Sequence, residues 1–292
     1  MKRFILLASF VALILAACTP VQQIDYTLAV DPYIGSGGHG HVFVGASVPY
    51  GMVQLGPQQI RDAWDWCSGY HYSDTLVIGF SHTHLSGTGI GDLGDVMLMP
   101  YDPTKTIWSS EYMPRKKAEA KHVYAHLDHS LEKVTPGFYS LEMPDYGVNV
   151  RLTATERTGI HEYTFTGDES AILVDLCSGI GWDGVTDWNL NVKDATHIEG
   201  YRRSAGWAED HTYYFAAEFS APILGQENVT ITDKEHAVAL KFDTSDQKCI
   251  LVKVGISPVS CENAWANLHA EQPAWDFEGT AAAAKDPYEK TP

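Results

Sequence analysis

The amino-acid sequence predicts a mainly β fold, a large antiparallel β-sandwich, and three observations carry that prediction. Apolar and polar residues alternate with the period of two that a half-buried strand requires, most clearly over residues 148–154. Turn-forming residues separate such stretches, as in Thr166-Gly167-Asp168 and Thr135-Pro136-Gly137. Amphipathic helices do not alternate with these strands, which argues against a doubly wound sheet or an α/β barrel.

Further strands are expected along the second half of the chain. They cover residues 161–165, 171–176, 213–219, 237–242 and 249–256. The character of the sequence changes after Pro258, because residues 262–268 have a helical composition and Ala281–Ala284 precede a polar end. We therefore expect a sandwich followed by the short start of a helical linker.

Length and composition limit the class of protein. The chain has 292 residues, of which 45% are hydrophobic and 20% charged, so it can bury a large core. Asp and Glu outnumber Lys and Arg by 37 to 20, and a net charge of −17 repels phosphate backbones. We expect no nucleic-acid partner. The 8 Trp and 15 Tyr residues fit a sugar-binding or protein-binding surface, although most aromatic residues lie in cores.

The N-terminus has the features of an export signal. Lys2 and Arg3 precede an uncharged apolar run, residues 4–17, which is too short to span a bilayer. Leu15-Ala16-Ala17-Cys18 resembles a bacterial lipobox. We expect residues 1–17 to be a lipoprotein signal peptide and Cys18 to be lipidated, which would anchor the protein in the cell envelope, in the periplasm or on the outer-membrane surface. An ordinary secretory signal is the alternative.

The four remaining cysteines form no recognisable metal or redox motif. They are Cys67, Cys177, Cys249 and Cys261, and no two of them form a C-x-x-C pair. In an exported protein they allow three disulfide connectivities, and buried thiols are an equally weighted alternative.

Residues 31–95 are unusually rich in Gly, His, Trp and Asp, which is typical of loops that carry a site. Gly89–Gly94 match G-x-G-x-x-G, but the residues that follow have the pattern of a strand ending at Pro100. A dinucleotide fingerprint requires a helix at that point, so we reject it. The glycines are expected to permit positive φ angles in a tight loop.

Two kinds of side chain in this region suit a ligand. His82 and His84 would project from one face of an extended segment, a geometry able to bind a metal, but a third ligand is missing and loop bracing or sugar contact is favoured. Asp92 and Asp95 suit sugar hydroxyls or the capping of local N–H groups, and both interpretations stay open.

The cluster from Trp64 to His71 suits a pyranose. An indole face beside a carboxylate and an imidazole matches the apolar C–H face and the hydroxyls of a sugar ring. The alternative is that one of Trp64 and Trp66 lies in the core and the other at a rim, and the local conformation decides between the two.

Several motifs, in order, resemble the N-terminal domain of glycoside hydrolase family 92. The motifs are Asp31-Pro32-Tyr33-Ile34-Gly35-Ser36-Gly37-Gly38-His39-Gly40-His41, Pro49-Tyr50-Gly51-Met52-Val53-Gln54-Leu55, the Trp64–His71 cluster and residues 79–95. Residues 255–264, with Trp275-Asp276-Phe277, resemble the exit from that domain. The resemblance covers about residues 31–277.

The resemblance implies an inverting, calcium-dependent exo-α-mannosidase of a kind found mostly in Bacteroidetes. It implies a β-supersandwich, similar to galactose mutarotase, packed on an (α/α)6 barrel that holds the catalytic carboxylates and the calcium ligands. That barrel would begin after residue 292, so we expect a domain over residues 18–272, a truncated linker over 273–292, and no catalytic residue, metal ligand or cofactor in this chain. Without the barrel, the chain alone is expected to be inactive.

The resemblance also implies sugar contacts by this domain. Trp64 is carried over as such a residue, together with Asp65 and Cys67, and so are His82 and His84. The expected partners are mannose-containing glycans and the barrel, in cis or in trans.

The sequence departs from the family pattern at two places. Trp66 stands where a smaller residue is expected, and residues 281–292 differ from the expected helical linker. Two other functions stay open, namely a stand-alone carbohydrate-binding surface lipoprotein and, last, an epimerase-like enzyme supported by fold analogy alone.

Overall fold

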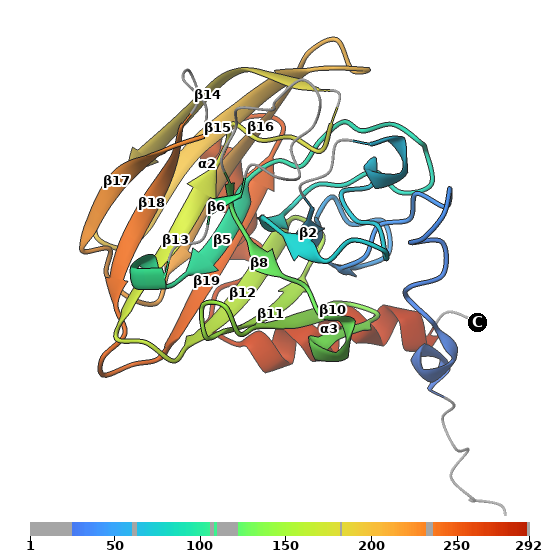
Figure 1. Cartoon of the computed structure of the whole chain (residues 1–292), viewed down its shortest axis with the longest axis horizontal. Coiled ribbons are helices and arrows are strands. Elements are labelled where there is room, and N and C mark those ends of the chain that lie inside the picture. Colours follow the sequence, from blue (N-terminus) through green and yellow to red (C-terminus); the bar gives the residue numbers. More distant parts are fainter. Residues whose placement is uncertain are drawn as a thin grey trace, which may run out of the picture.

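The protein is a β-sandwich with two helices at its C-terminal end (Figure 1). The computed structural model describes residues 25–59, 63–105, 108–109, 122–181, 183–231 and 236–290. The expected signal peptide, residues 1–17, and Cys18 lie outside the described residues. Within the described residues, two large sheets have antiparallel neighbours throughout, so the predicted fold class is confirmed.

The first sheet has seven strands. From one edge to the other they are β1 (Ala46–Ser47), β2 (Gln54–Gln58), β4 (Gly79–Ser81), β5 (Met97–Tyr101), β13 (Glu169–Asp175), β18 (His236–Asp243) and β17 (Gly225–Thr230). The second sheet has eight strands. They are β14 (Gly184–Val192), β15 (His197–Ala205), β16 (His211–Phe219), β19 (Cys249–Ser257), β12 (Thr158–Phe165), β11 (Val148–Ala154), β10 (Phe138–Met143) and β9 (Glu132–Thr135).

Short strand pairs and 3-10 turns complete the described structure. The pairs are β3 (Leu76–Val77) with β8 (Ala125–His126), and β6 (Trp108–Ser109) with β7 (His122–Val123). The turns are η1 (Tyr26–Ala29), η2 (Trp64–Trp66), η3 (Pro103–Lys105) and η4 (His129–Leu131).

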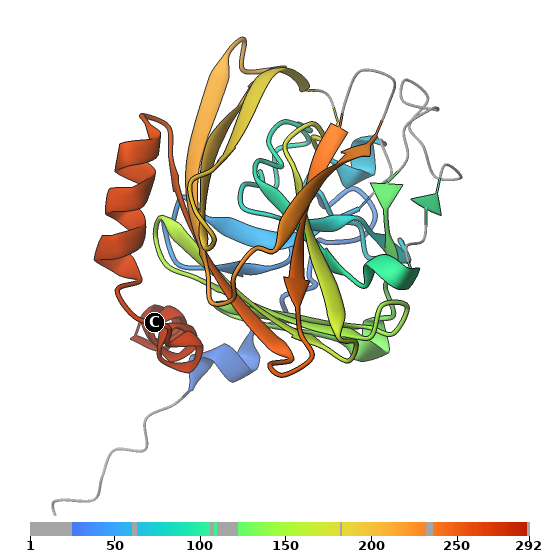
Figure 2. The ribbon, with the colours of Figure 1, turned by 90° about the vertical axis from the view of Figure 1, so that its left-hand side faces the viewer.

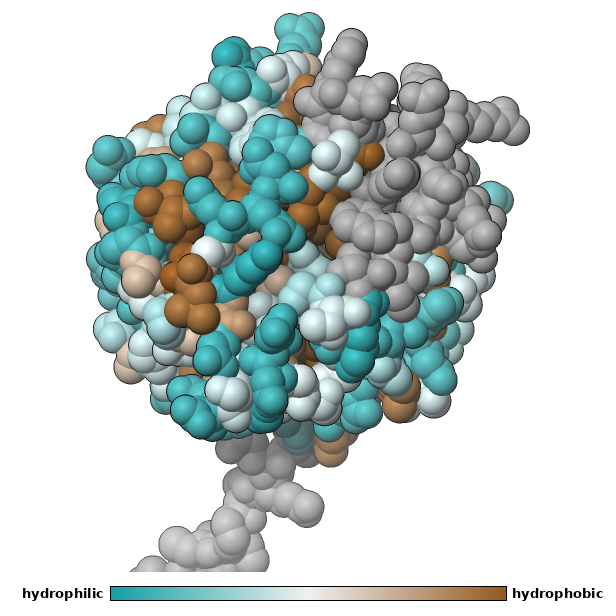
Figure 3. All heavy atoms as spheres, turned by 60° about the vertical axis from the view of Figure 1, so that its left-hand side comes forward, coloured by the Kyte–Doolittle hydropathy of each residue, from teal (hydrophilic) through white to brown (hydrophobic). Residues whose placement is uncertain are grey.

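The core lies between the two sheets because each strand turns one apolar face inward. On β19, Ile250, Val252, Val254 and Ile256 are fully buried in the same cluster as Leu173 of β13. At the far edge of the second sheet, the apolar residues of β14 are only half-buried. Figure 3 shows apolar patches interrupted by polar side chains on the side of the molecule where β14 and β17 lie.

The C-terminal helices pack against the second sheet (Figure 2). Helix α2 (Cys261–Glu271) begins at Ser260, whose hydroxyl accepts the Asn263 N–H at 3.2 Å, the usual N-cap arrangement. Helix α3 (Phe277–Lys290) crosses β11 and reaches η1. Gly137 has a φ of +77°, and a Cβ there would come within 2.8 Å of Ala284, so the predicted turn must hold glycine.

The expectation that residues 281–292 depart from a helical linker is wrong for the described part. Helix α3 continues to Lys290, with Pro287 inside its C-terminal part. Four consecutive alanines, the best helix formers, extend the helix, and Lys285 anchors it to Asp25 at 2.7 Å. No helix among the described residues has the length and apolar character needed to cross a membrane.

The cysteines are thiols in the described structure. Cys67, Cys177, Cys249 and Cys261 form no disulfide with one another. The alternative of buried thiols holds for Cys67 and Cys177, whereas Cys249 and Cys261 are half-buried. The Cys177 thiol donates to the His236 carbonyl at 3.1 Å. Desolvation raises the pKa of the other three thiols, which therefore stay protonated at neutral pH.

Candidate functional site

The motif-rich region folds into adjoining loops on the side of the molecule opposite β14 and β17 (Figure 1). Backbone contacts join the loops: the Tyr72 N–H donates to the Ser36 carbonyl at 2.8 Å, and the Gly87 N–H donates to the His41 carbonyl at 2.7 Å. The His71 ring contacts the Gly38 carbonyl at 3.2 Å. Segments far apart in sequence thus form one surface.

The turn η2 sends its two tryptophans in different directions. A 3-10 turn has three residues per turn, so residues two apart do not share a side as they would on a strand. Trp64 is 51% exposed and Trp66 only 8%. The Trp66 indole N–H donates to Asp74 at 2.7 Å, and its ring stacks on His71 at 4.3 Å. The interpretation with one core and one rim tryptophan is therefore confirmed. The large Trp66 side chain, which stands where a smaller residue is expected, packs in the core.

Trp64 is half-exposed and braced. Its indole N–H donates to the Gly89 carbonyl at 3.1 Å. The His41 ring meets it edge-on at 4.3 Å, and the His39 ring lies at 5.4 Å. These contacts fix one edge of the indole while part of the ring stays accessible to a ligand.

Asp65, next to Trp64, accepts from two histidines. Its Oδ1 lies 2.6 Å from His39 Nδ1 and 3.3 Å from His41 Nε2. The His39 hydrogen bond is the main cause that lowers the pKa of Asp65; partial desolvation opposes it, and the His41 contact adds to it. Asp65 is therefore a carboxylate at neutral pH. The sequence prediction named neither histidine as a site residue, although the His39-Gly40-His41 spacing in a glycine-rich loop was a usable signal.

The other three predicted sugar-binding residues are buried. Cys67 follows η2, and its backbone N–H donates to the Trp64 carbonyl at 3.2 Å. The His84 ring contacts the Gln54 carbonyl at 2.8 Å and the Ser81 hydroxyl at 3.0 Å.

His82 has a similar environment. Its ring contacts the Val96 carbonyl at 2.7 Å and His161 at 3.0 Å. Burial lowers the pKa of His82 and of His84 to about 4, so both are neutral at pH 7. These contacts brace the loop, and sugar contacts by Cys67, His82 and His84 stay predictions.

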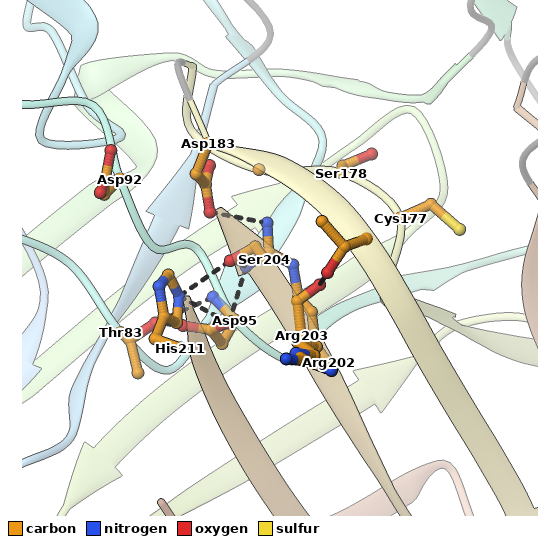
Figure 4. Close-up of polar contacts among 12 residues, drawn as sticks. Thr83, Asp92, Asp95, Cys177, Ser178, Asp183, Arg202, Arg203, Ser204 and His211 are labelled. Atoms are coloured by element: carbon orange, nitrogen blue, oxygen red, sulfur yellow. Dashed lines mark hydrogen bonds and ion pairs between the residues drawn. The ribbon is translucent and has the colours of Figure 1, made fainter. Parts of the chain in front are cut away.

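Asp95 belongs to a buried ion-pair network that joins the loop to the second sheet (Figure 4). Arg202, on β15, donates to Asp95 at 2.7 Å and to Asp183 at 3.0 Å, and all three side chains are fully buried. The Thr83 hydroxyl also donates to Asp95, at 2.6 Å. Figure 4 shows Ser204 and His211 beside this group.

Asp92 caps a hairpin turn. Its carboxylate accepts the backbone N–H groups of Trp207 at 3.2 Å and Ala208 at 2.9 Å. Asp92 does cap backbone N–H groups, but they belong to a hairpin more than a hundred residues away rather than to its own loop. Asp95 is engaged by Arg202 rather than exposed. The residues after Gly94 form strand β5, as expected when the dinucleotide fingerprint was rejected.

An open pocket of about 370 Å³ lies on the same group of loops. Its lining residues are Asp31, Tyr33, Ile34, Ser36, Gly37 and Tyr72. Tyr33 and Tyr72 meet edge to face at 5.4 Å, and Tyr72 stacks on His129 at 4.0 Å. The pocket combines aromatic rings with a carboxylate. The sequence prediction did not identify this pocket, although five of its six lining residues belong to the motif of residues 31–41.

Calcium, which the resemblance implies for the barrel, does not match the candidate metal group found among the described residues. Among the described residues, one group of three His, Cys, Asp or Glu side chains has ligand atoms close enough for a metal: His39, His41 and Asp65. Calcium takes six to eight oxygen ligands, whereas this group offers two imidazole nitrogens and one carboxylate. No calcium-dependent step is derived from it.

Solved structures share this fold. The family GH92 alpha-mannosidase of Bacteroides thetaiotaomicron, solved alone and with mannoimidazole, matches with a TM-score of 0.81 at 30% and 29% identity. The two matches cover 92% and 91% of this chain and 38% and 37% of that protein. The family GH92 inverting mannosidase of the same species has a TM-score of 0.71 at 22% identity, over 92% of this chain and 36% of that one.

A curated relative also matches. It is an uncharacterized secreted glycosidase of Arthroderma benhamiae, 29% identical over 160 residues, which are 52% of this chain and 20% of the relative. The chain thus spans less than two fifths of the solved mannosidases and a fifth of this glycosidase. The sandwich architecture that the resemblance implied is confirmed.

The family comparison covers most of the sequence. The model of the glycosyl hydrolase family 92 N-terminal domain matches residues 29–257, from just before the first motif to the end of β19. That span includes the Trp64–His71 cluster, both His-x-His pairs and the ion-pair network of Arg202. The chain therefore belongs to glycosyl hydrolase family 92 and carries that family's N-terminal domain.

Proposed function

We propose that this domain forms one wall of the mannoside-binding pocket of an inverting exo-α-mannosidase acting on mannose-containing glycans. The observation that carries the proposal is the half-exposed Trp64 indole fixed beside the ionised Asp65. An indole face stacks on the C–H face of a pyranose, and a carboxylate accepts hydrogen bonds from its hydroxyls. The match to the alpha-mannosidase solved with mannoimidazole supports mannose as the sugar.

Catalysis is proposed to need a second domain, an (α/α)6 barrel supplied in cis or in trans. Inverting hydrolysis uses a general acid and a general base on opposite sides of the sugar, each contributing roughly 10²–10⁴ in rate. In this chain, Asp95 and Asp183 are held by Arg202, and Asp65 is held by histidines. We assign the catalytic pair and calcium to the barrel. The barrel-free chain has almost no hydrolytic activity under this proposal.

The proposed location is the cell envelope, with lipid on Cys18 as the anchor. The secreted relative supports export, and the lipobox-like Leu15–Cys18 segment supports lipidation. Mass spectrometry of the protein from its own host tests the second part, because acylation of Cys18 adds a lipid mass that Cys18→Ala removes.

Binding to α-mannobiose, followed by NMR on the purified chain, tests the proposed wall. We expect weak binding, since an open surface desolvates a sugar less than a closed pocket does. Trp64→Ala abolishes it, whereas Trp207→Ala, which removes another exposed tryptophan, leaves it unchanged. Equal losses in both variants, or none in either, contradict the role of Trp64.

The same purified chain separates the proposal from its alternatives. With calcium and α-mannobiose, we expect no release of mannose, and chelator-sensitive hydrolysis by the chain alone contradicts the need for a barrel. Tight glycan binding by the chain alone favours the stand-alone carbohydrate-binding lipoprotein instead. Faster anomerisation of freshly dissolved aldoses favours the epimerase-like enzyme.

A further inference from the structure

We propose that His39, His41 and Asp65 form a binding site for a divalent transition-metal ion such as Zn²⁺. Their ligand atoms all lie within 4.8 Å of one another. Both imidazoles approach one carboxylate oxygen, Asp65 Oδ1, with His39 Nδ1 at 2.6 Å and His41 Nε2 at 3.3 Å. Imidazole nitrogen with carboxylate oxygen is a ligand set that zinc accepts and calcium does not favour.

The distances suit a tetrahedral ion after a small movement. With metal–ligand bonds near 2.0–2.1 Å, the ligands of a tetrahedral site lie about 3.3 Å apart. The separation of His41 Nε2 from Asp65 Oδ1 already has that value. His39 must move slightly away from Asp65 to admit the ion, and its side chain is 76% exposed, so little packing resists the movement. Water would take the fourth position, as in other three-ligand sites.

The backbone holds the second histidine in place. His41 is buried and has a φ of +56°, a left-handed conformation that non-glycine residues seldom adopt. The Gly87 N–H holds the His41 carbonyl, and a Cβ on Gly40 would lie 2.1 Å from the Gly35 carbonyl oxygen. Strain of this kind persists where the surroundings over-determine a functional side chain. The loop therefore presents one fixed ligand and one movable ligand to Asp65.

Two histidines approach the same carboxylate at Asp65, which distinguishes this group from ordinary surface ion pairs. His126 with Asp145, at 3.0 Å, and His197 with Asp194, at 2.8 Å, each join one imidazole to one carboxylate. The carboxylates of these pairs accept further hydrogen bonds from backbone N–H groups, those of His126 and Thr196, rather than from a second imidazole. Exposed pairs of that type contribute little to stability. Among the described residues, three metal-capable side chains come together at one place, formed by His39, His41 and Asp65. The inference does not rest on the mannoside proposal, although both involve Asp65.

Titration of the tag-free, chelator-treated full chain with Zn²⁺ by calorimetry tests the site. We expect saturable one-site binding, weakened at least about tenfold by His39→Ala and by Asp65→Asn, because each removes one of three ligands. His126→Ala is the matched control and leaves the affinity unchanged. His39→Ala also guards against misfolding, since His39 is exposed.

Co²⁺ gives a second, local readout. An open-shell ion at the site quenches the fluorescence of Trp64, whose ring lies 4.3 Å from that of His41. Trp64→Phe removes most of the quenching and keeps the Zn²⁺ affinity. Absence of saturable Zn²⁺ binding, or an equal loss in His126→Ala and His39→Ala, overturns the inference. Absence of mannoside binding by an unmodified chain that still binds Zn²⁺ counts against the mannoside proposal alone.

Discussion

Two histidine pairs with the same spacing have different environments in this domain, because one of them includes an exposed ring. His39 and His41 flank a glycine in a loop, and His39 is largely exposed. His82 and His84 flank Thr83 just after β4, and both are buried and bonded to carbonyls of the protein. The spacing His-x-His places two rings near each other, but the surroundings decide whether they meet a ligand or brace a loop.

The physical causes of the pKa shifts differ in the same way. Desolvation dominates in the buried pair and lowers both pKa values. At the surface group, the hydrogen bond from His39 is the main cause that lowers the pKa of Asp65, desolvation opposes it, and the hydrogen bond from His41 adds to the lowering. The buried half of the motif region therefore sets stability, and the exposed half is available for binding.

The largest effect expected of a single substitution comes from the buried ion-pair network. Arg202→Met leaves Asp95 and Asp183 buried without their cation, and we expect a loss of about 3–5 kcal/mol in the free energy of unfolding. Arg203→Met is the matched control, because Arg203 pairs with Asp210 at the surface. Urea denaturation should show a large shift for the first variant and an unchanged midpoint for the second. Similar shifts for the two would mean that burial does not separate these neighbours.

Acidification should act next, through the buried histidines. In the unfolded chain, His82, His84 and His161 become protonated near pH 6.5. In the folded protein, burial lowers the pKa of His82 and of His84 to about 4. Burial also lowers the pKa of His161 well below its ordinary value. The unfolded state thus binds more protons in this window, and stability falls as the pH falls from 6.5. By pH 5 the loss is roughly 2 kcal/mol for each of His82 and His84, and His161 adds a loss of the same sign.

Urea denaturation at pH 7 and pH 5 measures this acid sensitivity. His84→Asn should reduce the difference between the two midpoints, since one proton-linked group is gone. His126→Ala, at an exposed position, should leave the difference as it is. A His84→Asn protein with the original acid sensitivity would show that His84 is already protonated, or is solvated, in the fold.

Local patterns predicted the sandwich well, because alternation on β11 and turns such as the one at Gly137 follow from chain geometry. Side-chain partners that come from distant strands could not be predicted. Arg202 meets Asp95 across more than a hundred residues, and no local signal marks that pair. Trp64 and Trp66 point in different directions because they lie in a 3-10 turn. A strand-like alternation of residues does not predict such a turn.

The smallest effect on stability is expected at the exposed histidine. His39→Ala should leave the urea midpoint unchanged in chelator, because an exposed ion pair contributes little. It should nevertheless raise the pKa of Asp65 toward its ordinary value, since the His39 hydrogen bond is the largest cause of the shift. NMR titration of the Asp65 carboxyl carbon measures this, with His126→Ala as the control. An unmoved Asp65 pKa would assign the shift to His41, and a lowered midpoint would show that the exposed half of the motif also supports the fold.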